Sequence, residues 1–189
     1  MKKIVTMMAV AMSLAAMAAP EYVTKSASGT TAATVYFTAD AVKTPRLAGV
    51  VATSDKAGAV LSCRAGAGAY VVTVAVSTTT AVNQWINATN GLEANDVLVL
   101  QKLNGNCYSS TVASAETNMV TLASGGFGIA TAVGDSIYKM SAATSLPVGA
   151  ATVSYQGEAI YAGNRGRPIR ITLDGTSACS IASATAAYE

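Results

Sequence analysis

The chain contains no histidine and few charged residues. Charged side chains make up 12% of its 189 residues, which is about half the usual share in a soluble domain. The absence of histidine removes the commonest general base and the commonest metal ligand. The sequence also lacks the Walker A lysine pattern and the GxSxG motif, which excludes the nucleotide and esterase sites that these motifs form. We therefore predict a protein that is not an enzyme, without catalytic residues, metal ligands or cofactors.

Aromatic residues are also scarce, at 6% of the chain, whereas hydrophobic types together reach 51%. Disordered chains are rich in charge and poor in apolar residues, so this class is excluded. A free monomer normally carries more surface charge than this for solubility. Small side chains and few charges favour a surface that neighbouring copies cover, and we expect a homo-oligomer.

The first 18 residues have the pattern of an export leader. Lys2 and Lys3 precede an apolar run over residues 4–16, and Ala16-Met17-Ala18 is a small-x-small cleavage signal. We predict a signal-peptide-like leader over 1–18 and, where it is cleaved, a periplasmic, cell-surface or extracellular protein. The alternative is a retained hydrophobic segment that packs on a partner or anchors in a membrane; retention would fit a location in a virion.

The net charge of +2 comes from Lys2 and Lys3, because the rest of the chain holds ten basic and ten acidic residues. A neutral protein has no general attraction for nucleic acid or for anionic membranes, so we expect neither as a partner after leader removal. Among the basic residues, Arg165, Arg167 and Arg170 cluster in the sequence. We interpret this cluster as a solvated loop.

Three cysteines are present, Cys63, Cys107 and Cys179, and their long spacing forms no CxxC motif. A zinc ribbon or redox motif is therefore disfavoured. In an exported protein two of them could form a disulfide and the third could link subunits. The alternative is that all three are buried thiols that behave as small hydrophobic side chains.

Short segments rich in β-branched residues, separated by turn residues, predict an all-β fold. The clearest strand is 70–77, and the strands 46–53 and 59–64 are predicted to form a hairpin. No segment after the leader has a helical period over ten or more residues. We predict a β-sandwich or barrel-like domain over 34–189, preceded by an extended N-terminal arm over 19–33.

The middle of the chain repeats a pattern. Residues 92–100 resemble residues 131–139, since each segment has a small-residue lead, an Asn-Asp or Gly-Asp turn and then a strand. Two further strand candidates, 109–113 and 119–122, lie between them. Four short strands in about fifty residues predict a small SH3-like or OB-like barrel inserted at 91–140.

The repeated aspartates, Asp96 and Asp135, are interpreted as turn-fixing residues whose carboxylates accept hydrogen bonds from backbone N–H groups two residues on. A catalytic carboxylate pair is the alternative. The only tryptophan, Trp85, lies where a loop or short helix is expected. We interpret it as a core or interface anchor, because no aromatic companion stands nearby to form a sugar platform.

Two passages resemble structural proteins of bacteriophage virions, in particular small head-decoration or head-stabilising proteins of tailed phages. The first runs from Asp96-Val-Leu-Val-Leu through residues 110–114 and 119–124 to 134–139, and the second is 166–181. This resemblance implies a β-rich, non-catalytic subunit that packs repetitively on a protein lattice.

Two functions remain open at this point. The first is a structural or assembly subunit of a repetitive particle or surface layer, of virion-decoration or cell-surface type, whose partners are copies of itself or a lattice. The alternative is an exported binding module, an adhesin or glycan-binding domain. Its loops are rich in Ser, Thr, Asn and Gly near the aromatic residues Tyr70, Trp85, Tyr108, Tyr155 and Tyr161.

Overall fold

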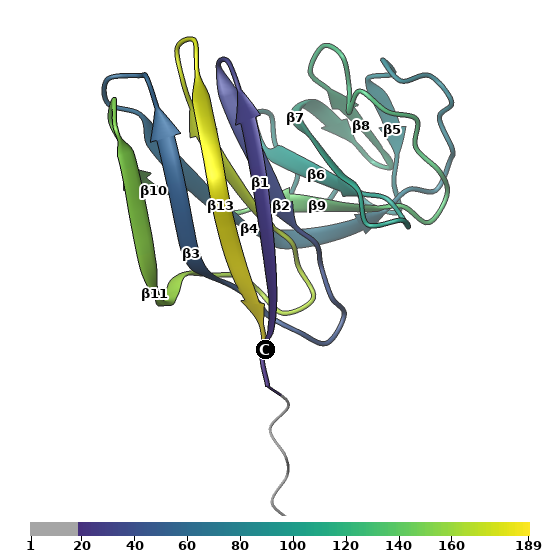
Figure 1. The fold of residues 1–189 in the computed structure, drawn as a ribbon. Coiled ribbons are helices and arrows are strands. Elements are labelled where there is room, and N and C mark those ends of the chain that lie inside the picture. Colours follow the sequence, from purple (N-terminus) through teal and green to yellow (C-terminus); the bar gives the residue numbers. More distant parts are fainter. Residues whose placement is uncertain (1–18) are drawn as a thin grey trace, which may run out of the picture.

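The structure, a computed structural model, describes residues 19–189, in which every regular element is a β-strand. The predicted leader over 1–18 lies outside the described residues. The prediction of an all-β, sandwich-like fold is confirmed, because the strands form two antiparallel sheets (Figure 1). The strands are β1 (Glu21–Gly29), β2 (Ala32–Phe37), β3 (Pro45–Ser54), β4 (Val60–Val71), β5 (Asn83–Trp85), β6 (Val97–Gln101), β7 (Cys107–Glu116), β8 (Met119–Leu122), β9 (Ser136–Met140), β10 (Thr144–Pro147), β11 (Thr152–Ala162), β12 (Ile169–Asp174) and β13 (Cys179–Tyr188).

Eight of these strands form the sandwich, and they follow the order of a jelly roll. β1 pairs with β13, β2 with β12, β3 with β11 and β4 with β10, so the chain doubles back on itself as one long ribbon. Two further ladders, β13 with β3 and β12 with β4, roll the ribbon up. One layer is therefore β1-β13-β3-β11, and it faces β2-β12-β4-β10. A double sheet of eight strands rolled in this way is a jelly roll.

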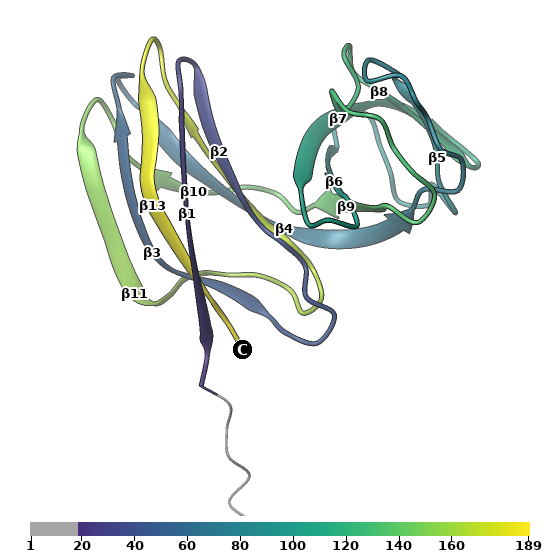
Figure 2. The same cartoon turned by 45° about the vertical axis from the view of Figure 1, so that its right-hand side comes forward.

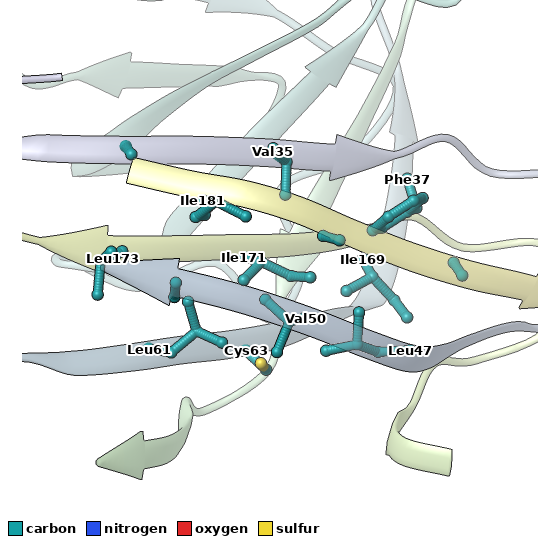
Figure 3. Close-up of a cluster of buried hydrophobic side chains, with 14 of the residues drawn as sticks. Val35, Phe37, Leu47, Val50, Leu61, Cys63, Ile169, Ile171, Leu173 and Ile181 are labelled. Atoms are coloured by element: carbon teal, nitrogen blue, oxygen red, sulfur yellow. The ribbon is translucent and has the colours of Figure 1, made fainter. Parts of the chain in front are cut away.

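A single apolar core lies between the two layers of the sandwich. Along β12, Ile169, Ile171 and Leu173 are buried, whereas Arg170 and Thr172 between them are half-buried on the other face. This period of two is what a strand with one buried face requires. Figure 3 shows these side chains beside buried residues of the neighbouring strands. Each fully buried Leu or Ile contributes about 1.5–3 kcal/mol.

The predicted hairpin of 46–53 with 59–64 is wrong. The two segments become β3 and the start of β4, and they belong to opposite layers. Both strands bury alternate side chains in the same core. This burial pattern is the same whether the two strands lie side by side in one layer or face each other from opposite layers. The connection at Asp174-Gly175, between β12 and β13, likewise leads from one layer to the other.

Beyond the sandwich, β4 continues into a second part of its sheet, which we call the curled lobe (residues 66–140). There β4 pairs with β9, and the sheet continues through β6, β7, β8 and β5. This part of the sheet curves round on itself (Figure 2). An isolated β-bridge between Val72 and Ile86 joins the end of β4 to the end of β5, but no continuous ladder forms between these two strands. Leu98, Leu100 and Ile137 lie in the core of the lobe. The strand predicted at 70–77 overlaps β4 only at residues 70–71, because β4 ends at Val71.

The curled lobe is fastened to the sandwich at the end of β2. Tyr138 and Met140 of the lobe form a small buried cluster against which Tyr36 packs. The Tyr36 hydroxyl donates to Ser109 Oγ at 2.8 Å, and the Ala39 N–H donates to Gln101 Oε1 at 2.8 Å. Strands that are distant in the sequence therefore meet at this junction.

Candidate assembly surfaces

The two halves of the internal repeat pair with each other as β6 and β9. Asn95 and Gly134, the residues before the aspartates, have φ of 74° and 92°, the left-handed region that Asn and Gly adopt most readily. Asp96 accepts from the Glu93 N–H and Asp135 from the Ala132 N–H, each at 2.7 Å. The turn-fixing interpretation is therefore confirmed, although the donor lies three residues before the aspartate rather than two after it.

Asp96 and Asp135 do not form a carboxylate pair, because they lie at opposite ends of the antiparallel β6–β9 ladder. Each binds a lysine instead. Lys102 Nζ lies 2.5 Å from Asp135, and Lys139 Nζ lies 2.8 Å from Asp96. The hydrogen bond with Asp96 raises the pKa of Lys139. These two ion pairs fasten both ends of the ladder.

All three cysteines are free thiols in the structure. Cys63 and Cys179 are buried in the sandwich core, and Cys107 is half-buried beside the junction with the curled lobe. Desolvation by burial raises the pKa of Cys63 and of Cys107 to about 11. Such thiols stay protonated and weakly reactive near neutral pH.

Trp85 lies on the last position of β5, at the end of the curled sheet. The expected loop or short helix is wrong, because Asn83, Gln84 and Trp85 all pair with β8. The indole is 39% exposed, so Trp85 is not a core residue. Its role as an interface anchor stays a prediction.

The segment 19–33, predicted as an extended arm, contains β1, an outer strand of the four-stranded layer (Figure 1). β1 pairs with β13 alone, so its other backbone edge has no ladder partner in the described chain. The opposite edge strand, β11, is broken by a bulge between Gln156 and Tyr161, and β1 has a smaller irregularity between Lys25 and Ala27. An unpaired edge is a template on which another chain can add a strand.

The outer face of the four-stranded layer is rich in hydroxyl groups, and we call it the hydroxyl face. Thr24 and Thr185 are hydrogen-bonded across β1 and β13 at 2.8 Å, as are Thr53 and Thr152 across β3 and β11. Among the outward residues of β1, β3 and β13, Arg46 is the charged one, and it pairs with Glu189 at 2.9 Å. The hydroxyl face consists of Thr24, Ser26, Ser28, Thr53, Thr152, Ser154, Ser180, Ser183 and Thr185.

One row of this face crosses all four strands, because Ser28 lies opposite Ser180, Ser180 opposite Thr53, and Thr53 opposite Thr152. An open pocket of about 400 Å³ lies over Ser28, Thr53 and Ser180. Its lining offers hydroxyls and backbone groups, which do not form a catalytic set, and the Cys179 side chain beneath it is buried in the core. Within 19–189, no group of three Cys, Asp or Glu could hold a metal. No helix in this range is long and apolar enough to cross a membrane.

The arginines predicted as a solvated loop divide between loop and sheet. Arg165 is exposed, and its Nε donates to the Val42 carbonyl at 2.9 Å. Arg167 instead lies over the ring of Tyr138, 5.7 Å from its centroid. Arg170 belongs to β12 and lies opposite Arg64 on β4. Sequence reasoning missed Arg64 because only strand pairing brings it to this place.

No family model and no curated protein matches this chain. Among solved structures, VP17, a capsid protein of bacteriophage P23-77, is similar at 12% identity and a TM-score of 0.26, over 89% of this chain and 97% of that one. The match is thus to a bacteriophage capsid protein, and it is weak. The likeness is too low to assign a site or a partner to this chain.

Proposed function

We propose that this protein is a non-catalytic structural subunit that assembles with copies of itself or on a repetitive shell, as a virion or cell-surface component. The observation that carries the proposal is the hydroxyl face, which runs up to the unpaired edge of β1. Soluble monomers usually protect such an edge with outward or inward-pointing charges, proline or bulges. On β1 this protection is limited to Lys25, which lies over the ring of Phe37, 5.9 Å from its centroid, and to the irregularity between Lys25 and Ala27.

The jelly roll by itself does not choose between the two functions, because both viral capsid subunits and lectin domains use it. A glycan site normally gathers aromatic side chains around a few polar groups. Here the exposed aromatic residues Tyr22 and Trp85 lie on β1 and β5, at separate parts of the molecule (Figure 1). This separation favours assembly over an adhesin or glycan-binding role.

The assembly contact that we propose has two components. A strand from a neighbouring copy adds to the free edge of β1, where main-chain hydrogen bonds supply the attraction without strict demands on sequence. The hydroxyl face beside this edge packs against the same neighbour, and its small, uncharged side chains cost little to desolvate compared with ionised groups.

The test is sedimentation velocity with light scattering on the full chain over a wide range of concentrations. The wild-type chain is expected to form large oligomers as its concentration rises. Ser180→Lys combined with Ser183→Lys places two charges on the hydroxyl face and is expected to shift the population to monomers. Leu103→Lys, at a position that is 82% exposed on the curled lobe, is the matched control and is expected to assemble as wild type does.

A wild-type chain that stays monomeric at every concentration, and that joins no particle, contradicts the proposed function. Intact mass of the protein from its native source then distinguishes the two settings. A mass beginning at Ala19 in a periplasmic or culture fraction supports a surface subunit. A mass beginning at Met1 in sedimenting particles supports a virion component.

A further inference from the structure

The outer face of the other layer carries three arginines, Arg64, Arg167 and Arg170, which we call the arginine face. Arg170 lies directly opposite Arg64 on one side and Tyr36 on the other. The neighbours of Arg64 and Arg170 along their strands are buried in the core, so both arginines project from the outer face. Arg167 reaches the same region over the ring of Tyr138.

This arrangement is unfavourable for a lone molecule. Like charges directly opposite each other in a ladder destabilise a sheet. None of the three arginines forms an ion pair with an acidic residue among the described ones. Arg64 donates to the Ser141 carbonyl at 2.8 Å, and the buried Nε of Arg170 has no hydrogen-bond partner. A guanidinium is a planar fork of five donors that matches a carboxylate.

Most acidic groups of the described chain are already engaged. Five of them form ion pairs with lysine or arginine. Two others bind backbone N–H groups, since Asp40 accepts from Val42 and Asp55 from the loop 176–178. These carboxylates are therefore not the partners that the arginine face lacks.

Two exposed glutamates on the curled lobe, Glu93 and Glu116, form no ion pair within the described residues, and we call them the acidic rim. The Thr89 hydroxyl donates to the Glu116 carbonyl, and the Leu92 N–H donates to the Thr89 carbonyl at 3.0 Å. The loop that carries Glu93 is therefore fastened to the tip of the β7–β8 hairpin that carries Glu116.

We propose that the arginine face of one copy binds the acidic rim of the next copy. The occupant is a second copy of this chain because the arginine face has no acidic partner among the described residues and the acidic rim offers the complementary charge. A contact between two different surfaces repeats from head to tail, which builds rings or filaments rather than closed pairs. This inference rests on the proposed function and adds the charged contact that orients the copies.

The test uses charge reversal in the full chain, with sedimentation velocity at low salt. One variant carries Arg64→Glu and Arg170→Glu, and the other carries Glu93→Arg and Glu116→Arg. Each variant alone is expected to lose the large oligomers that the wild-type chain forms. Their equimolar mixture is expected to regain large oligomers in which the two variants alternate, because the intact rim of one binds the intact arginine face of the other and the two reversed surfaces complement each other. A chain with all four substitutions restores complementarity, so it is expected to assemble and thereby serves as the folding control.

A milder variant, Arg170→Gln, is expected to weaken association about tenfold, as the loss of one charge-assisted contact does. Assembly of both reversed variants at wild-type strength overturns this inference and leaves the proposed function in place. A wild-type chain that remains monomeric overturns both. Single-stranded DNA that binds wild type but not the arginine variant, with assembly unchanged, would assign the face to nucleic acid instead and overturn the inference.

Discussion

At the scale of single residues, several charged side chains of the described chain hold backbone segments in place through hydrogen bonds. The Asp55 carboxylate accepts hydrogen bonds from the N–H groups of Thr176 and Ser177 at 2.8 Å and from that of Ala178 at 3.1 Å. The Ser177 hydroxyl donates to it at 2.6 Å. Asp55 thus ties the connection between β3 and β4 to the connection between β12 and β13, two of the places where the chain crosses between layers.

These bonds predict acid sensitivity at Asp55. They favour the ionised carboxylate and hold its pKa well below the usual range of aspartate. Because the pKa of Asp55 is lower in the folded state than in the unfolded state, these bonds stabilise the fold fully above the unfolded-state pKa of about 4. This stabilisation is lost as the pH falls from there toward the folded-state pKa. Asp55→Asn is expected to lower the melting temperature at pH 7 and to reduce the further loss below about pH 4.

Thermal unfolding from pH 7 to pH 3 measures both effects. Asp40→Asn is the matched control, because Asp40 accepts a single backbone hydrogen bond, from Val42. An Asp55→Asn chain with the wild-type melting temperature and pH profile would rule out this role.

The ion pair between Lys102 and Asp135 gives a second prediction at this scale. Asp135 is 1% exposed and Lys102 is 20% exposed, so removal of the lysine leaves a buried carboxylate without its cation. Lys102→Met is expected to cost about 3 kcal/mol, and adding Asp135→Asn is expected to recover part of that loss. Lys139→Met breaks the more exposed pair with Asp96 and is expected to cost about 1 kcal/mol or less. Urea unfolding of the four chains decides whether the two pairs differ in this way.

At the scale of elements, the strands were largely predictable from their own residues, but their partners were not. The strand predicted at 119–122 is β8 with the same bounds. The hairpin of 46–53 with 59–64 was predicted wrongly because alternation records which face of a strand is buried. It does not record whether the neighbour along the chain lies beside the strand or across the core.

The turn between β1 and β2 gives a prediction for an element. A Cβ on Gly29 would lie 2.0 Å from the Ala32 carbonyl oxygen, a backbone atom that cannot move without opening the turn. Gly29→Ala is expected to cost about 2–3 kcal/mol and to loosen β1 from β13. Hydrogen exchange along β1 and urea unfolding measure these two effects. Gly157→Ala, where nothing lies within 4 Å of the added Cβ, is the control, and equal effects of the two substitutions would refute the steric argument.

At the scale of the whole molecule, the jelly roll brings together residues that the sequence separates. The curled lobe is inserted between β4 and β10, which pair with each other in the sandwich, so the lobe projects from the end of the sandwich (Figure 2). Unpaired arginines lie on the sandwich and unpaired glutamates lie on the lobe. This distribution is the basis for the head-to-tail assembly proposed above, which is expected to weaken as salt screens the charges.

The sequence by itself determined the chemical character of this protein. Alternating β-branched and small residues specify strands, Asn-Asp and Gly-Asp place the repeated turns, and the absence of histidine removes a large class of active sites, because these are local or compositional properties. Only the tertiary structure decided that Arg64 lies beside Arg170 and that the hydroxyl row crosses four strands. Those contacts depend on the pairing of strands far apart in the chain, which follows from how the whole ribbon rolls up around its core.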